Sequence, residues 1–182
     1  MPIFVGMADV IEPAATGRAA CRGCREKIAK GDLRFGERAP SSFGEGEQTS
    51  WFHIACAAER RPGKLAPALE EYAGEIPGRA DIERIVANGV SNPSLAEVSR
   101  VERSPTGRAT CQECHEKIAK DELRVAIEKE ADGAMTTTSF IHLRCAPTNL
   151  GDEGLIEKLH RVARGLSEGD LAELDHTVHS AA

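Results

Sequence analysis

Residues 16–34 read TGRAACRGCREKIAKGDLR and residues 106–124 read TGRATCQECHEKIAKDELR, with 13 of 19 aligned positions identical. The cysteine pair of the first stretch recurs 90 positions later, and a downstream His-x2-Cys pair recurs 89 positions later. A period this long indicates tandem domains, because solenoid repeats usually run about 20–45 residues. We therefore predict a first domain over residues 1–91, a linker over 92–103 and a second domain over 104–182.

The residue pattern of each repeat predicts an α+β unit, in which a short antiparallel sheet is followed by C-terminal helices. Branched and aromatic residues favour strands at 33–39 and 50–56 in the first unit, and at 123–129 and 139–145 in the second. Apolar residues at helical spacing favour helices over 80–89 and 153–165. A last helix is expected over 167–178, because Ser167 followed by Asp170 forms a capping-box pattern.

The cysteines and two of the histidines form two sets with the spacing of metal ligands. Each unit has Cys-x2-Cys, then 28 or 27 residues, then His-x2-Cys. Zinc prefers tetrahedral thiolate and imidazole ligands, and four protein ligands leave no position for a catalytic water. Buried cysteines or three disulfides are the alternative, but the two matched sets use all six cysteines. We expect two structural Zn²⁺ ions, with the ligands Cys21, Cys24, His53 and Cys56, and Cys111, Cys114, His142 and Cys145. His115 competes with His142 for the second site, but Arg25 stands at its place in the first.

Composition limits the classes of protein that the chain fits. Aromatic residues make up 4% of the 182 residues. A domain of about 90 residues then has a marginal core and needs a cross-link, such as a bound metal, to be stable. The sequence has no apolar run long enough for a membrane span and no pattern of a secretory signal, so no membrane partner is expected. Reduced, metal-binding cysteines favour an intracellular location, in the cytoplasm or nucleoid of a bacterium or the nucleus of a eukaryote.

The string GRAxCxxCxEKIAKxxLR, with the later Trp-Phe-His-x2-Cys, resembles the PARP-type zinc finger of poly(ADP-ribose) polymerase and DNA ligase III. The resemblance covers residues 14–90 and 104–165, although the second unit has Ser139-Phe140-Ile141 in place of a Trp-aromatic pair before the histidine. It implies recognition of DNA strand breaks (nicks, gaps or ends) by shape. It also implies phosphate contacts by the arginines of the GRA and LR segments and base stacking by an apolar loop residue. These positions are Arg18, Arg34 and Phe43 in the first unit and Arg108, Arg124 and Met135 in the second.

The charge around the two cysteine pairs is unequal. Residues 16–34 hold six basic and two acidic residues, whereas residues 106–124 hold four of each. Because phosphate contacts dominate sequence-independent binding to DNA, we expect the first unit to contribute most. Its further candidate DNA contacts are Arg22, Lys27 and Lys30. Phe43 either stacks on a base or folds back on its own core. The second unit either binds DNA weakly, adds geometry to the first unit or contacts protein.

The sequence thus predicts a zinc-dependent protein that binds DNA strand breaks and acts with a repair-protein partner. The alternative is a zinc-stapled adaptor that binds other proteins, which the formal net charge of −6 also allows. We do not expect an enzyme, because the sequence shows no phosphate-cradling glycine-rich Lys motif, nucleophile elbow or open metal site.

Overall fold

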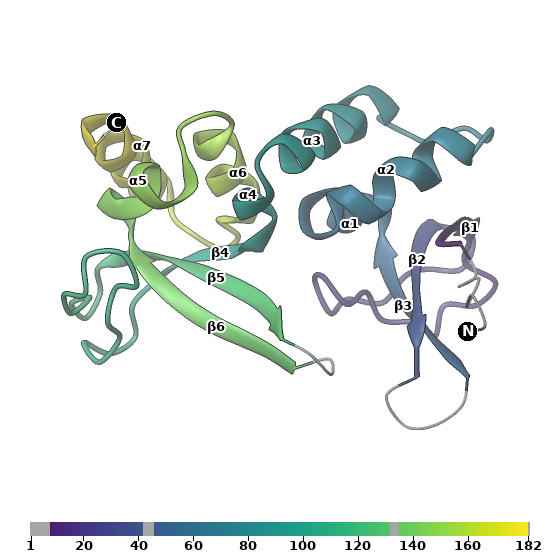
Figure 1. The fold of residues 1–182 in the computed structure, drawn as a ribbon. Coiled ribbons are helices and arrows are strands. Elements are labelled where there is room, and N and C mark those ends of the chain that lie inside the picture. The colour runs from purple at the N-terminus through teal and green to yellow at the C-terminus, as the bar shows by residue number, and fades with distance from the viewer. Residues whose placement is uncertain (1–7, 42–45, 132–134, 182) are drawn as a thin grey trace, which may run out of the picture. The chain divides into compact units, whose positions relative to one another are not determined.

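The computed structural model describes residues 8–41, 46–131 and 135–181. The chain divides into two compact units, Met1–Ser91 and Asn92–Ala182. Each unit has one three-stranded antiparallel sheet with its helices, so the predicted α+β class with short antiparallel sheets is confirmed (Figure 1).

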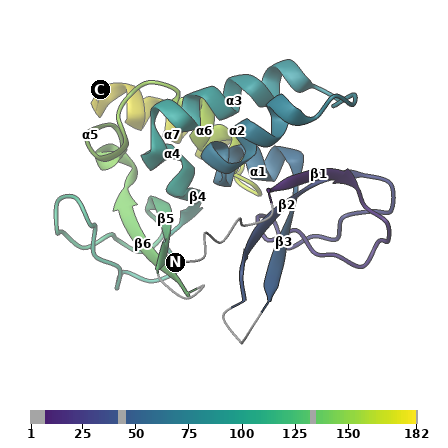
Figure 2. The same cartoon turned by 45° about the vertical axis from the view of Figure 1, so that its right-hand side comes forward.

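The sheet of the first unit has the order β1-β2-β3. Its strands are β1 (Val10–Pro13), β2 (Leu33–Pro40) and β3 (Glu47–His53). Figure 2 shows β1 lying beside β2, where Glu12 is paired with Arg34. The chain continues into α1 (Ile54–Arg60), α2 (Pro62–Glu71) and α3 (Arg79–Ser91), and α3 packs on both earlier helices.

The second unit repeats this plan with the order β4-β5-β6. It begins with α4 (Pro93–Glu97) and continues with β4 (Val98–Arg103), β5 (Leu123–Ala131) and β6 (Met135–His142). The short η1 (Leu143–Cys145) follows β6 and leads into α5 (Ala146–Leu150), α6 (Leu155–Val162) and α7 (Glu168–Ala181).

The predicted linker over 92–103 is wrong as a description of local structure, because these residues hold α4 and the edge strand β4. Val98 and Val101 are buried in the core of the second unit. The edge strand β1 of the first unit was not predicted either. The signal was present in the sequence, since Ile11-Glu12 recurs as Val101-Glu102 at the same offset of 90 as the cysteines.

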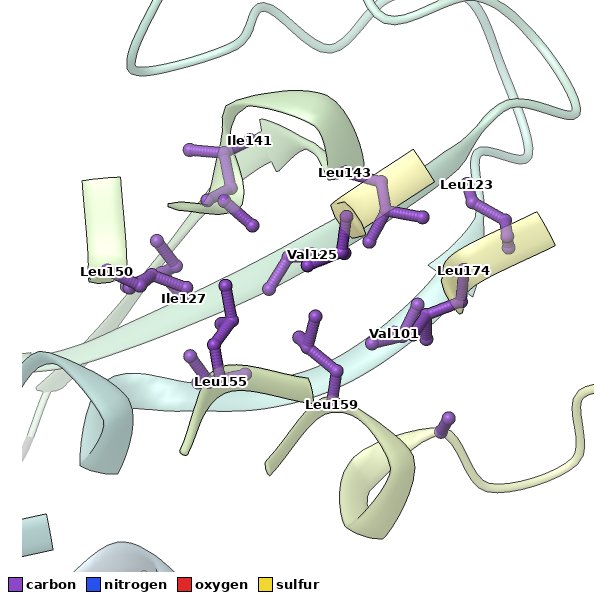
Figure 3. Packing of buried hydrophobic residues seen from close by; sticks show 14 of the residues in the cluster. Val101, Leu123, Val125, Ile127, Ile141, Leu143, Leu150, Leu155, Leu159 and Leu174 are labelled. Atoms are coloured by element: carbon purple, nitrogen blue, oxygen red, sulfur yellow. The ribbon is translucent and has the colours of Figure 1, made fainter. Parts of the chain in front are cut away.

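The two cores are built mainly from aliphatic side chains, as the low aromatic content requires. In the second unit Val125, Leu155, Leu159 and Leu174 point toward one another between the sheet and the helices (Figure 3). The isoleucine of each EKIAK stretch, Ile28 or Ile118, is fully buried and anchors the loop that carries the cysteine pair. The repeated stretch is therefore a packing element as well as a charged one.

Helix α7 begins with the predicted capping box. The amide of Asp170 donates to Ser167 Oγ at 3.2 Å, and the amide of Ser167 donates to an Asp170 carboxylate oxygen at 2.9 Å. These reciprocal bonds satisfy two amides at the start of the helix. Within the described ranges, no helix combines the length and apolar character needed to cross a membrane.

One cross-strand pair shows how the two units fill the same space differently. Gly36 lies opposite Trp51, and a Cβ at Gly36 would approach Trp51 Cζ3 to 2.6 Å, which is too close for a real contact. The equivalent pair in the second unit is Ala126 and Phe140, a larger residue beside a smaller ring. The two pairs therefore conserve volume across the repeat.

We predict that Gly36→Ala destabilises the first unit by about 1–3 kcal/mol, because the new methyl group overpacks the Trp51 ring. Adding Trp51→Phe should recover part of this loss, since the double variant reproduces the pair in the second unit. The measurement is denaturant unfolding of the zinc-saturated protein followed by circular dichroism. Gly63→Ala is the control, because a Cβ there meets nothing within 4 Å and the helix α2 favours alanine. Additive costs in the double variant would contradict the explanation.

Candidate metal centres and the surface around them

The structure brings the four expected ligands of the first unit together. The ligand atoms of Cys21, Cys24, His53 and Cys56 all lie within 4.8 Å of one another. His53 Nδ1 is 3.4 Å from Cys24 Sγ and 4.0 Å from Cys56 Sγ. Ligand atoms of a tetrahedral zinc site are separated by roughly 3.5–3.8 Å, given the usual Zn–S and Zn–N distances. The donor set and its spacing therefore fit a zinc ion.

The second site has the same geometry and settles which histidine takes part. Cys111, Cys114, His142 and Cys145 gather within 4.8 Å, and His142 Nδ1 is 3.3 Å from Cys114 Sγ. The other ring nitrogen, Nε2, lies 3.2 Å from the carbonyl oxygen of Lys117. This contact favours a proton on Nε2 and leaves Nδ1 free to bind metal. His115 is exposed and does not belong to the site.

Each Cys-x2-Cys pair lies in a tight turn, which we call the cysteine turn (residues 20–27 and 110–117). Its ends are bridged between Ala20 and Lys27 in the first unit. The turn requires a left-handed residue directly after the second cysteine, and Arg25 has φ 67° while His115 has φ 61°. Backbone amides also stabilise the sulfur atoms, since the His53 amide donates to Cys21 Sγ at 3.3 Å.

Within each site the pKa values of the cysteine thiols differ strongly from one another. A hydrogen bond from Cys56 and several backbone amides lower the pKa of Cys21 to about 4, against the effect of burial. The hydrogen bond to Cys21 and burial raise the pKa of Cys56. In the second site burial and the neighbouring Cys114 raise the pKa of Cys145 to about 12. Crowded thiols cannot all ionise without a cation among them, and a divalent metal supplies that charge.

Both sites are closed Cys3His zinc sites. Each offers four protein ligands, the full coordination of structural zinc, and the ion's role is to cross-link the cysteine turn to the end of the His-bearing strand. The expectation of two structural zinc ions is thus confirmed.

Basic side chains on and beside the first cysteine turn face solvent. Arg18, Arg25, Lys27 and Lys30 are exposed, and among the described residues none of the four has an ion-pair partner. Arg22 is also exposed, but its guanidinium donates to Ser50 Oγ at 2.8 Å. Four free cations therefore lie within 13 residues of chain.

The second cysteine turn has fewer free cations, and its acidic residues are paired within the unit. Arg144 bridges Glu116 and Glu122, with both contacts at 3.0 Å. Glu113 accepts a hydrogen bond from the Asn149 side chain at 2.7 Å. Lys117 donates to the Arg108 carbonyl oxygen and to Thr110 Oγ1, both at 3.0 Å. Arg108 and Lys120 remain exposed, and among the described residues neither side chain has a partner.

The two arginines of the LR segments do not lie on the exposed surface. Arg34 is 9% exposed and Arg124 is 6% exposed. Each guanidinium contacts a carboxylate from the edge strand and the face of an aromatic ring, which sequence reasoning did not foresee. Phe43 lies outside the described residues, and of Met135 only the backbone, at the start of β6, is described.

Residues 12–90 match the family model described as the Poly(ADP-ribose) polymerase and DNA-Ligase Zn-finger region. The first unit is a PARP-type zinc finger. The second unit has the same ligand set and strand order and a similar cysteine-turn sequence, so it repeats the plan of the first. We call the two units the first and the second finger.

Curated relatives extend this similarity over both fingers. A poly [ADP-ribose] polymerase of Sarcophaga peregrina is 26% identical over 132 residues, which is 63% of this chain and 13% of the relative. Poly [ADP-ribose] polymerase 1 of Danio rerio is 30% identical over 128 residues, with the same coverage. Polynucleotide 3'-phosphatase ZDP of Arabidopsis thaliana is 24% identical over 196 residues, covering 93% of this chain and 28% of the relative. The chain therefore spans less than a third of the length of these relatives.

We predict that a strong chelator unfolds both fingers, because binding of structural zinc is coupled to folding and contributes about 10–16 kcal/mol in small zinc domains. Cys21→Ser and Cys111→Ser should each reduce the zinc content from two ions to one, since each removes a ligand from a different site. Zinc content is measured by metal analysis and folding by circular dichroism. A chelated protein with an unaltered spectrum would contradict a structural role for the metal.

Proposed function

We propose that the protein binds DNA at strand breaks and recognises their shape, not their sequence. The family match and relatives named for polymerisation of ADP-ribose or for polynucleotide 3'-phosphatase activity support a role at damaged DNA. The two zinc ions in this proposal hold the binding surfaces in place and take no part in chemistry.

The observation that carries the proposal is the group of free cations on the first finger, Arg18, Arg25, Lys27 and Lys30. Lysine and arginine side chains that bind backbone phosphates provide affinity without reading bases. The chain as a whole has a formal charge of −6, so long-range attraction to a polyanion is absent. A local surface of this kind is therefore the feature that makes contact with DNA favourable.

The proposal assigns the main contact to the first finger. On and beside the second cysteine turn the acidic residues bind Arg144 and Asn149. Among the described residues there, Arg108 and Lys120 are the cations without a side-chain partner. The second finger then adds a weaker contact and restricts the geometry of the break that the pair accepts.

The exposed cations, and not Arg34 and Arg124, carry this proposal. Both arginines are almost fully buried and already bind a carboxylate. Each guanidinium therefore offers a phosphate little exposed surface, and its Nε and Nη2 already bind the carboxylate. The proposed contacts are therefore Arg18, Arg25, Lys27, Lys30 and Arg108, together with Arg22, which is exposed although it also binds Ser50. Phe43 is the candidate for stacking on an exposed base.

We predict tighter binding to nicked, gapped or blunt-ended duplex than to a closed circular duplex of the same sequence, because only a break exposes a base-pair face. Fluorescence anisotropy or competition at two salt concentrations measures the difference. Affinity should fall steeply with salt, since phosphate contacts release counterions. Equal affinity for broken and closed DNA, or no binding to either, would contradict the proposal and favour a protein-binding adaptor.

We predict that Arg18→Ala lowers the slope of log affinity against log salt by about 0.9, because one phosphate contact is lost. Arg108→Ala, at the matched position of the second finger, should have a smaller effect on affinity. Phe43→Ala should weaken binding by about 1–3 kcal/mol if its ring stacks on a base, with little change in the salt slope. All three variants should keep two zinc ions. Unchanged affinity in both first-finger variants would refute this placement of the site.

A further inference from the structure

Three side chains from three strands form a contact chain around the buried Arg34 in the first finger. Arg34 on β2 donates to Glu12 on β1 through Nε at 3.2 Å and through Nη2 at 2.5 Å. Its guanidinium carbon lies 3.5 Å from the centroid of the Trp51 ring on β3. A planar guanidinium can satisfy both neighbours at once, because its edge donates hydrogen bonds while its face stacks. We call this group the edge clamp.

The second finger contains the same clamp with a different ring. Arg124 donates to Glu102 at 3.0 Å and 2.5 Å, and its guanidinium carbon lies 3.7 Å from the centroid of the Phe140 ring. Burial would raise the pKa of Glu102, but hydrogen bonds from Arg100 and Arg124 hold it below the usual range. The clamp has thus been kept although the aromatic residue, the loop length and the surface charge differ between the fingers.

The ring of each clamp is joined through its own backbone to the cysteine turn. The Arg22 amide, one residue after Cys21, donates to the Trp51 carbonyl oxygen at 2.8 Å. In the second finger the Gln112 amide donates to the Phe140 carbonyl oxygen at 2.9 Å. The clamp therefore acts on the same backbone segment that places the first zinc ligand.

The clamp is also in register with the zinc-binding histidine. Glu12, Arg34 and His53 occupy directly opposed positions on the three strands, and Glu102, Arg124 and His142 do the same. The histidine amide in turn donates to the first cysteine sulfur at 3.3 Å in both fingers. This row therefore links the carboxylate at the edge strand to two of the four zinc ligands.

We propose that Glu12 and Glu102 are positioning residues that, through Arg34 and Arg124, hold the cysteine turn against the histidine strand and so retain zinc. In this proposal the edge strand contributes to zinc retention although it carries no zinc ligand. The ligands come from the cysteine turn and from the histidine strand with the residues that follow it. The clamp matters to the proposed function because the turn that it holds carries the basic residues. Retention of zinc itself does not depend on DNA.

The test compares zinc transfer from the full chain to a colorimetric chelator in the absence of DNA. Glu12→Gln keeps the size of the side chain and removes its charge, and Arg34→Lys keeps the charge and removes the planar fork. Each substitution should make one of the two zinc ions transfer about tenfold faster. Substituting a residue that holds a metal ligand in place typically changes metal binding by about 10- to 100-fold, and we take the lower end of that range. Glu102→Gln should speed transfer of the other ion. Asp32→Asn is the matched control, because it removes one negative charge from an exposed position near the same turn.

Unchanged zinc transfer in both Glu12→Gln and Arg34→Lys would overturn the clamp. A second measurement compares the affinity of the zinc-saturated variants for nicked duplex DNA. If Glu12→Gln strengthens DNA binding more than Asp32→Asn does, with zinc transfer unchanged, then Glu12 masks Arg34 from phosphate and does not position the turn. If no variant, nor the unmodified protein, binds DNA, the proposed function fails while the zinc measurement still decides the clamp.

Discussion

The structure depends on bringing two short segments, separated by 27 or 28 residues, to within bonding distance of one zinc ion. Each finger has a small core with few aromatic residues, and domains of this size commonly need a metal or disulfide cross-link. The Cys3His site supplies the missing cross-link, and the crowded thiols need the cation as much as the fold does. The sheet then serves as the frame: its middle strand lies between the edge carboxylate and the histidine ligand, and its last strand carries that histidine.

The duplication shows which features of this frame are fixed and which have changed. The ligands, the left-handed residue after the second cysteine, the buried isoleucine and the Glu-Arg-aromatic clamp occur in both fingers. Changes elsewhere come in compensating pairs. Gly36 with Trp51 becomes Ala126 with Phe140, and the acidic residues of the second turn occur together with Arg144, where the first finger has Ala55. The scaffold is thus the same in both fingers, while the described surface around the metal has two free cations in the second finger against four in the first.

Much of this was accessible from the sequence, and the failures have physical causes. The repeat, the ligand sets, the two strands of each hairpin and the capping box of α7 were predicted, because each is encoded by residue types at fixed local spacing. The predicted second strand of each hairpin ran too far, since the chain turns into a helix at Ile54 and at Leu143. The edge strands β1 and β4 were missed, because four to six residues of weak alternation resemble a linker until their partner strand is known. The expected role of Arg34 and Arg124 rested on resemblance. Only the tertiary contacts show that each guanidinium already binds a carboxylate and stacks on a ring.

The sequence by itself determined the number of fingers, the identity of the metal and its eight ligands, since cysteine and histidine spacing leaves few other solutions. It also determined the contrast in charge between the two turns. Tertiary structure alone decided which of those charges are free. Glu113, Glu116 and Glu122 lie beside Asn149 and Arg144 only after β6 and the segment that follows it fold back over the turn. The net charge can be counted from the sequence. The charge available to a binding partner depends on which side chains form ion pairs or hydrogen bonds with one another in the folded protein.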